Sequence, residues 1–173
     1  VNLAADSKSA GRWNTNAGGE YYACGIGSSI AGRGADLLLV DDPHSEQDVL
    51  NGNFDVFDKA YDWFAYGART RLMPGGRVAI IQTRWHEDDL AGRLLPTDYH
   101  GQSGPVEGYG GEVWEVINFP AICEQNDDPL GRKIGDALWP EYFNIDILNN
   151  IKNVQTPRNW ASLYQQRPRA EES

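Results

Sequence analysis

The run Leu37–Asp42, four apolar residues followed by two adjacent carboxylates, constrains the fold of this chain more than any other feature. A strand that is apolar on both faces is typical of a parallel sheet with helices on both sides. In open α/β sheets the ligand site lies beyond the carboxyl ends of the strands. The run therefore predicts a buried strand that delivers Asp41 and Asp42 to a candidate site. A core strand that ends in an Asp42-Pro43 turn would give the same six residues.

A second apolar strand is expected over residues 77–82, and Thr83-Arg84 follow it directly. Between the two strands, aromatic and apolar residues recur at three- and four-residue steps over 54–72, which predicts an amphipathic helix. The breaker sequence 73–76, Met-Pro-Gly-Gly, is expected to end that helix. Strand, helix and strand in this order predict a parallel pair. Both strand ends would then place their polar residues at one edge of the sheet.

Further elements are expected on both sides of this unit. They are a strand over 20–25, a short helix capped by Ser45, a helix from about 86 to 94, a surface loop over 96–111, a strand over 112–119, and helices over about 144–153 and 157–166. Cys24 and Cys123 lie far apart in apolar settings, which predicts two buried thiols.

A chain of 173 residues, with 40% hydrophobic and 23% charged residues, fits one soluble domain that can bury a core. No apolar run approaches the length of a membrane span. The net charge of −10 argues against a protein that simply coats nucleic acid, which would be basic. The chain begins at Val1 and its only methionine is Met73, so we expect a fragment that begins within a longer protein.

The strand-end residues suit nucleoside triphosphate chemistry. In P-loop nucleoside triphosphatases, the first carboxylate at such a strand end helps to hold Mg²⁺ and the next residue polarises the attacking water. A hydroxyl such as that of Thr83 can respond to the γ-phosphate. The phosphate-cradling Gly-x-x-x-x-Gly-Lys-Ser/Thr is missing from this sequence. The acidic run 86–89 invites a metal-site interpretation, but acidic residues at a helix start also suit the helix dipole.

Taken together, several segments resemble the large terminase subunit of tailed bacteriophages, the ATP-driven motor that packages DNA into procapsids. In chain order they are residues 32–43 (Gly-Arg-Gly-Ala-Asp-Leu-Leu-Leu-Val-Asp-Asp-Pro), 71–76 (Arg-Leu-Met-Pro-Gly-Gly), 82–94 (beginning Gln-Thr-Arg-Trp-His-Glu-Asp-Asp-Leu), 138–141 (Leu-Trp-Pro-Glu) and 163–168 (Leu-Tyr-Gln-Gln-Arg-Pro). The resemblance implies a partial P-loop NTPase fold of the ASCE type, a mostly parallel sheet with flanking helices that lacks the P-loop segment.

The resemblance also implies a domain boundary. Residues 1–168 would be the C-terminal portion of the terminase ATPase domain, and residues 169–173 would begin the linker towards a nuclease domain. Such a segment carries no complete active site, so we expect the chain by itself neither to hydrolyse ATP nor to cleave DNA.

The resemblance assigns roles to four residues. Asp41 matches the Walker B acid that holds Mg²⁺ with ATP, and Asp42 matches the catalytic acid position, where many terminases carry Glu. Thr83 falls in the motif that couples ATP hydrolysis to domain movement, and Arg84 lies beside it. The candidates for an arginine finger are Arg33, Arg69, Arg71 and Arg84, and we expect Arg84 to lie near the site.

The partners implied by the resemblance are double-stranded DNA, the portal protein and the small terminase subunit. A full-length protein would form a homo-oligomeric ring in the host cytoplasm, docked on the procapsid, without membrane contact. Two other functions fit the same residues. The chain could be an inactive prophage remnant that serves as a binding module. It could also be a two-metal nuclease in which Glu112 and Glu115 join Asp41 and Asp42.

Overall fold

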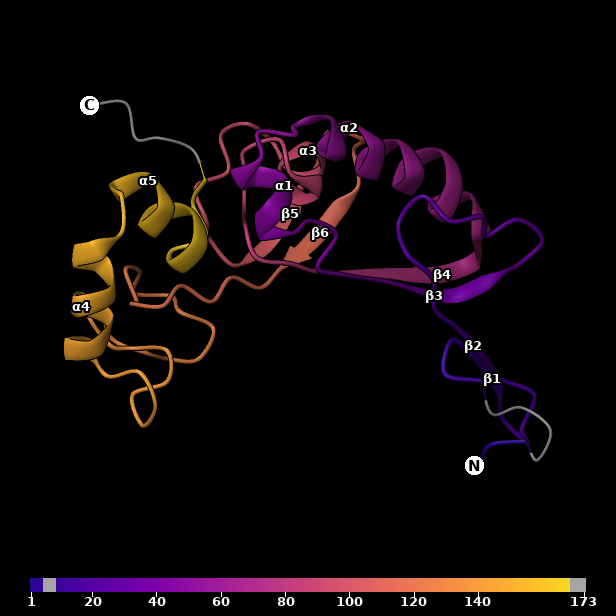
Figure 1. The fold of residues 1–173 in the computed structure, drawn as a ribbon. Helices are drawn as coiled ribbons and strands as arrows, with labels where there is room; N and C mark the ends of the chain where they lie inside the picture. The colour runs from indigo at the N-terminus through magenta and orange to yellow at the C-terminus, as the bar shows by residue number, and fades with distance from the viewer. Residues whose placement is uncertain (5–8, 169–173) are drawn as a thin grey trace. The chain divides into compact units, whose positions relative to one another are not determined.

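The computed structural model describes residues 1–4 and 9–168, and Figure 1 shows the course of the chain. The segment 169–173, where we expected a linker, lies outside the described residues. The chain divides into two compact units, one made of Val1–Leu38 with Asp62–Arg77 and the other of Leu39–Tyr61 with Val78–Ser173. The candidate site residues Asp41, Asp42, Thr83 and Arg84 all belong to the second unit.

A small antiparallel hairpin forms part of the first unit. Strand β1 (Arg12–Asn14) pairs with β2 (Glu20–Tyr22), and the ring of Trp13 stacks on that of Tyr21 with their centroids 4.8 Å apart. The expected strand at 20–25 is therefore present but shorter. The prediction of a buried thiol at Cys24 is wrong, because this residue follows the end of β2 and is exposed.

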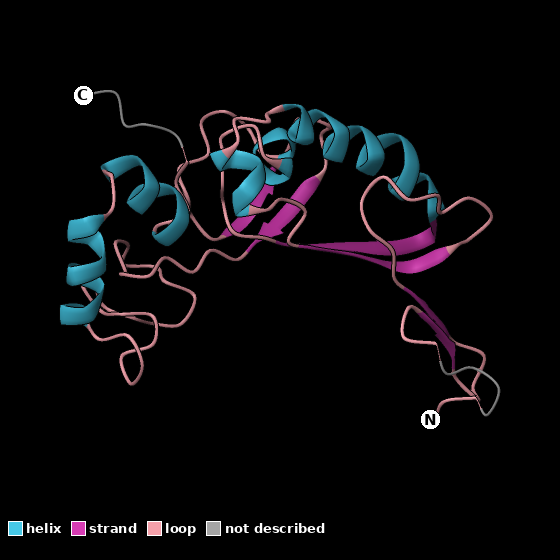
Figure 2. Ribbon diagram, in the orientation of Figure 1, coloured by secondary structure: helices cyan, strands magenta, loops and turns pink. Residues whose placement is uncertain are grey.

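The expected parallel pair is confirmed. Strand β3 (Ala35–Asp41) pairs in parallel with β4 (Leu72–Ile81), with helical segments between them in the sequence (Figure 2). The protein is thus a mixed α/β fold with short sheets. The expectation of two covered faces is wrong for β3 in the described chain. Leu37 and Leu39 are 61% and 54% exposed while Val40 is buried, so the covered and open faces alternate.

The segment between β3 and β4 differs in detail from the expected single helix. Ser45 caps α1 (Glu46–Leu50), as expected, and its hydroxyl accepts a hydrogen bond from the Asp48 N–H. Next come α2 (Asp55–Asp62), the π-helical segment Trp63–Ala68 and the 3₁₀ turn Arg69–Arg71.

The Met-Pro-Gly-Gly sequence does not end this helix, because residues 73–76 already belong to β4. A Cβ atom at Gly76 would come within 3.0 Å of the Ala35 carbonyl oxygen. Glycine at this position therefore permits a close approach of two backbones, which is one of its uses in strands. The turn composition that predicted a break in fact serves strand pairing.

Helix α3 (Leu90–Leu94) and a second hairpin follow β4. Strand β5 (Gly104–Glu107) pairs antiparallel with β6 (Val113–Val116), and Gly104 lies opposite Val116. The prediction of a loop over 96–111 is wrong in its second half, where β5 lies. Pro105, which suggested a loop, is tolerated because this strand lies at a sheet edge.

The C-terminal helices agree with the sequence prediction. Helix α4 (Ile145–Val154) is capped by Asn144, and α5 (Pro157–Asn159) leads into the π-helical segment Trp160–Tyr164. The buried Trp160 packs in one cluster with Ala137 and Leu148. In residues 1–4 and 9–168, no helix has the length and apolar character needed to cross a membrane.

Candidate strand-edge site

The two strand ends meet as the sequence predicted. Asp42, directly after β3, donates its backbone N–H to the carbonyl oxygen of Ile81 in β4 at 2.9 Å. Its side-chain Oδ1 lies 3.4 Å from the backbone nitrogen of Thr83, which donates to it. Asp41 and Asp42 are both exposed at this edge. Two carboxylates and one hydroxyl residue are therefore brought together by the pairing of β3 with β4.

Asp42 adopts a backbone conformation that is uncommon for a residue with a side chain. Its φ is +41°, and Gln166 (φ +59°) is the other non-glycine residue with a positive φ in the described part of the chain. Asp tolerates this region better than most residues, because its short polar side chain forms local hydrogen bonds. Positive φ values cluster at functional sites. Asp42 contacts Thr83, and Gln166 contacts the next residue, Arg84.

The backbone of Arg84 is held by the C-terminal segment. Its N–H donates to Oε1 of Gln166 at 3.1 Å, and its carbonyl oxygen accepts from the Ser162 hydroxyl at 2.7 Å. Gln166 in turn donates from Nε2 to the Leu163 carbonyl oxygen at 2.9 Å. The residues after β4 are thus fixed on one side by Asp42 and on the other by the segment around Gln166.

The side chain of Arg84 is engaged in a buried ion pair. Its Nε donates to both carboxylate oxygens of Asp89, at 3.0 and 2.9 Å. The side chain of Asp89 is fully buried and that of Arg84 is 11% exposed. The guanidinium Nε of Arg84 is therefore used within its own loop. This contact favours a positioning role for Arg84 in the described arrangement.

Asp89 also caps α3 and forms hydrogen bonds with the backbone of the loop that precedes this helix. Its carboxylate accepts from the N–H groups of Gly92, Trp85 and His86 at 2.9, 3.1 and 3.4 Å. The predicted helix start at residue 86 placed Asp89 inside the helix, so sequence reasoning missed its capping role. Gly92 is required for this turn, because a Cβ atom there would lie only 1.7 Å from the carbonyl oxygen of Glu87.

His44 is a further site residue that sequence reasoning missed. Its ring is buried beside Asp42-Pro43, and Nε2 accepts the N–H of Leu90 at 2.9 Å. The ring of Phe57 meets it edge to face at 4.8 Å. Because Nε2 accepts, the ring proton is on Nδ1, which is buried and has no hydrogen-bond partner among the described residues. Burial lowers the pKa of His44 below 6.5, against smaller opposing effects of Asp89 and Asp48.

The lowered pKa of His44 gives a pH dependence of stability. A neutral His44 is required to accept from Leu90, and the unfolded chain binds its proton more readily than the folded one. Stability due to this group is therefore complete above pH 6.5 and falls as the pH drops below it. We expect the free energy of unfolding to decrease by up to about 1.4 kcal/mol for each pH unit in that range.

Urea unfolding at pH 7.5 and 5.5 would measure this dependence. The matched variant is His44→Gln, whose amide oxygen can accept the same hydrogen bond but does not titrate in this range. We expect the variant to lose less stability than the parent between the two pH values. Equal losses would assign the pH dependence to other groups.

The other candidate residues belong to other segments of the chain and have contacts of their own. Arg33, of the first unit, forms an ion pair with Glu20, and its guanidinium lies 4.0 Å from the centre of the Tyr22 ring. The nuclease interpretation requires Glu112 and Glu115. Glu115 belongs to β6, and Glu112 directly precedes this strand. Within the described ranges no group of three or more His, Cys, Asp and Glu side chains is arranged to hold a metal ion. No feature of these residues favours a two-metal centre.

No protein-family model, curated protein or solved structure matches this chain. A function for this chain is therefore inferred from the strand-edge residues and from the sequence resemblance.

Proposed function

We propose that this chain is part of the large terminase subunit, the ATP-driven motor that packages viral double-stranded DNA into procapsids. The observation that carries the proposal is the hydrogen bond between the Thr83 N–H and the Asp42 carboxylate at the ends of two parallel strands. A strand-end acid next to a hydroxyl residue of the neighbouring strand suits a site that binds Mg²⁺-ATP and responds to its γ-phosphate.

Asp41 is the residue that would hold Mg²⁺. Its carboxylate is exposed at the end of β3 and supplies the hard oxygen ligand that this ion prefers. Mg²⁺ commonly takes only one or two protein carboxylates and fills its remaining positions with water and phosphate oxygens. The ion would neutralise charge on the phosphates when bound. A site with Asp41 as its main protein ligand therefore agrees with the lack of a larger carboxylate cluster in the described residues.

Asp42 is proposed to orient the attacking water. Its carboxylate is positioned by a hydrogen bond from the backbone N–H of Thr83, so a shift of either residue would displace the other. Thr83 is followed by Arg84, whose backbone is bonded to Ser162 and Gln166. Movement at the strand edge would be passed by this route to the C-terminal segment. Arg84 acts here as a positioning residue through its ion pair with Asp89.

The first test is to sequence the coding DNA on both sides of this segment. We expect an in-frame Gly-x-x-x-x-Gly-Lys-Ser/Thr upstream and an acid-rich nuclease domain downstream. The full product should hydrolyse ATP only with Mg²⁺, and Asp41→Ala should lower kcat by about 100-fold or more, because it removes a preorganised electrostatic contact to the phosphates through the ion.

The matched control is Asp36→Ala, which removes an exposed carboxylate from the same strand but far from its carboxyl end. Its ATP hydrolysis should equal that of the parent. Stop codons on both sides of the segment would overturn the proposal, and so would an equal loss of activity in the two variants.

A further inference from the structure

The acidic charge of this chain is unevenly divided between its two units. The sequence of the first unit, residues 1–38 and 62–77, holds six basic and four acidic residues, and that of the second holds nine basic and twenty-one acidic ones. The net charge of −10 therefore comes from the second unit, and the first unit has an excess of positive charge. Such an asymmetry favours contact of the basic part with a polyanion.

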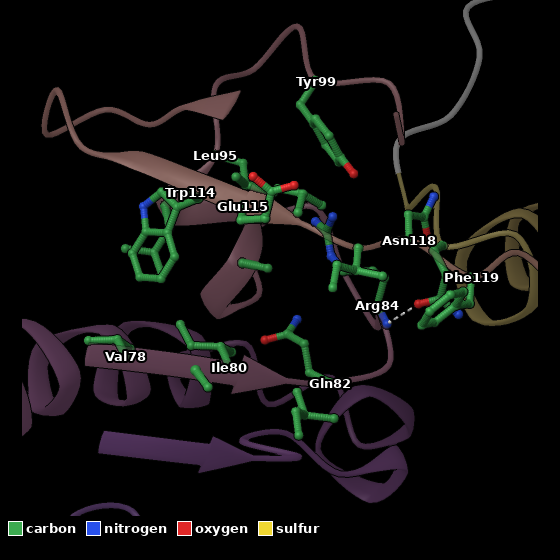
Figure 3. A pocket seen from close by; sticks show the side chains of 17 residues that line it. Val78, Ile80, Gln82, Arg84, Leu95, Tyr99, Trp114, Glu115, Asn118 and Phe119 are labelled. Atoms are coloured by element: carbon green, nitrogen blue, oxygen red, sulfur yellow. Dashed lines mark hydrogen bonds between the residues drawn. The ribbon is translucent and has the colours of Figure 1, made fainter. Parts of the chain in front are cut away.

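The large cavity of the second unit does not suit a polyanion. It has a volume of about 660 Å³ and is lined mostly by apolar side chains (Figure 3). Arg84 is the one basic residue among the described residues that line it, and the Nε of this arginine is already bonded to Asp89. Glu115 adds a negative charge to the same lining. The first unit is therefore the better place for an anion site.

One face of the β1–β2 hairpin carries a cluster of charged side chains. In the register of the hairpin, Arg12 lies opposite Tyr22 and Asn14 lies opposite Glu20. Directly opposed residues share a face, and so does every second residue of a strand, so these four side chains lie on one face. The guanidinium of Arg33 lies over the ring of Tyr22, 4.0 Å from its centre. Two arginines are therefore present on this face.

Glu20 bridges the two arginines. Its Oε1 accepts a hydrogen bond from Nη1 of Arg33, and its Oε2 lies 3.5 Å from Nη2 of Arg12. Each guanidinium has five N–H donors, so donors remain on both arginines for a further acceptor. The side chains of Arg12, Glu20 and Arg33 are 53%, 42% and 31% exposed, so a ligand can reach them from solvent.

A pocket of about 360 Å³ lies against this cluster. It is lined by Arg12, Glu20 and the loop 31–34, Ala-Gly-Arg-Gly. Apart from Arg33, the side chains of this loop are no larger than a methyl group, so a ligand can approach its backbone closely. Gly32 has a φ of +77°, and a Cβ atom there would meet no other atom within 4 Å. This side of the loop is therefore open.

The charges around the pocket suit a phosphodiester group. Arginine binds phosphate oxygens through parallel N–H···O bonds. Arg12, Arg33 and Glu20 together carry one net positive charge, which matches the single negative charge of a diester. A terminal phosphate carries a charge of about −1.5 to −2 at pH 7 and would leave the site negative. The small residues of the loop offer no side-chain group that could read a base edge, so such a contact would position the backbone without sequence preference.

We propose that the pocket between the β1–β2 hairpin and the loop 31–34 binds a phosphodiester group of a DNA backbone, held by Arg12 and Arg33. Glu20 keeps the two guanidiniums side by side before the phosphate arrives. The choice of DNA rests on the proposed function, because a packaging motor must hold its duplex whatever the sequence. Neither Mg²⁺ nor ATP takes part in this contact, so DNA binding without nucleotide tests it separately.

The test is fluorescence anisotropy of a labelled mixed-sequence duplex, titrated with the purified chain in the absence of nucleotide and Mg²⁺. We expect Arg33→Gln to weaken binding about fivefold, because a charge-assisted hydrogen bond to the phosphate is lost. Titrations between about 50 and 200 mM NaCl give the slope of log K against log salt concentration. The same variant should reduce this slope by about 0.9, the value for one phosphate contact.

The matched control is Arg77→Gln, which removes an exposed arginine of the same unit that does not line the pocket. It should change the affinity by less than about twofold and keep the salt slope.

A second variant should strengthen binding, which no loss of folding can imitate. Glu20→Gln removes the negative charge next to the phosphate, while its amide oxygen can still accept from Arg33. We expect about threefold tighter binding of the duplex, since a like charge close to the phosphate is removed. Asp36→Asn removes an exposed carboxylate of the same unit outside the pocket and should have a much smaller effect.

Three results would overturn the proposal. The first is that the parent chain does not bind the duplex even at the lowest salt concentration. The second is equal weakening by Arg33→Gln and Arg77→Gln, which would mean that the total charge of the unit attracts DNA. The third is displacement of the duplex by inorganic phosphate at constant ionic strength, which would identify a free phosphate ion as the ligand. Each of these results leaves the role of Asp41 towards Mg²⁺-ATP untouched, and failure of the Asp41→Ala test leaves this pocket untouched.

Discussion

Replacing Asp89 by alanine is expected to lower the free energy of unfolding by about 3–5 kcal/mol. The change leaves the buried guanidinium of Arg84 without its partner. It also removes the acceptor of three backbone N–H groups, those of Trp85, His86 and Gly92. Urea unfolding monitored by tryptophan fluorescence would measure the loss.

The neighbouring carboxylate provides the control for this experiment. Asp88 has a side chain that is 61% exposed, so Asp88→Ala should change stability by no more than about 0.5 kcal/mol. The double variant Arg84→Met with Asp89→Leu should recover part of the loss, because it removes the unpaired charge as well as the carboxylate. Similar losses from Asp88→Ala and Asp89→Ala would contradict the central role of Asp89.

Phe57→Ala is the second change for which we expect a large effect, a loss of about 3–5 kcal/mol. Phe57 is 1% exposed and lies against two histidines, with its ring edge to face on His44 and stacked on His86 at 5.1 Å. Its removal would leave a cavity beneath the residues that follow β3 and would open the ring of His44 to water. Equilibrium unfolding in urea would give the size of the loss.

Phe54 offers a matched comparison, because it also contacts Phe57 and His86 but is 50% exposed. Phe54→Ala should therefore cost much less than Phe57→Ala, since less apolar surface leaves the core. A second readout is the pKa of His44, which should rise towards 6.5 in Phe57→Ala as burial is lost. Equal losses of stability in the two variants would show that Phe57 is not the centre of this cluster.

The strand-edge site was predictable because its signals are local. An apolar run followed by Asp41-Asp42, and another followed by Thr83-Arg84, indicate two strand ends from the sequence alone. The helical periodicity between them predicted the parallel pairing that the structure has. The roles of these residues towards Mg²⁺ and ATP stay predictions.

The features that sequence reasoning missed depend on partners distant in the chain. His44 accepts a hydrogen bond from Leu90, which is 46 residues away, and Gln166 accepts one from Arg84 across 82 residues. The role of Asp89 had a local signal, since Asp is a common N-cap, but the helix was predicted to begin at about residue 86, four residues before Leu90. Pro105 concealed a strand because proline is usually taken as evidence against one.

The anchoring of Thr83 and Arg84 from two sides constrains how this chain can evolve. Thr83 is bonded to Asp42 and Arg84 to Gln166, and each of these partners has a positive φ that few residue types adopt without strain. A residue inserted between Thr83 and Arg84 would break one attachment or the other. Substitutions at Asp42 and Gln166 would be restricted mainly to residues such as Asn and Gly that tolerate the backbone. Among descendants of this sequence, insertions and deletions between Thr83 and Arg84 should therefore be rarer than exchanges of one aliphatic residue for another in the strands.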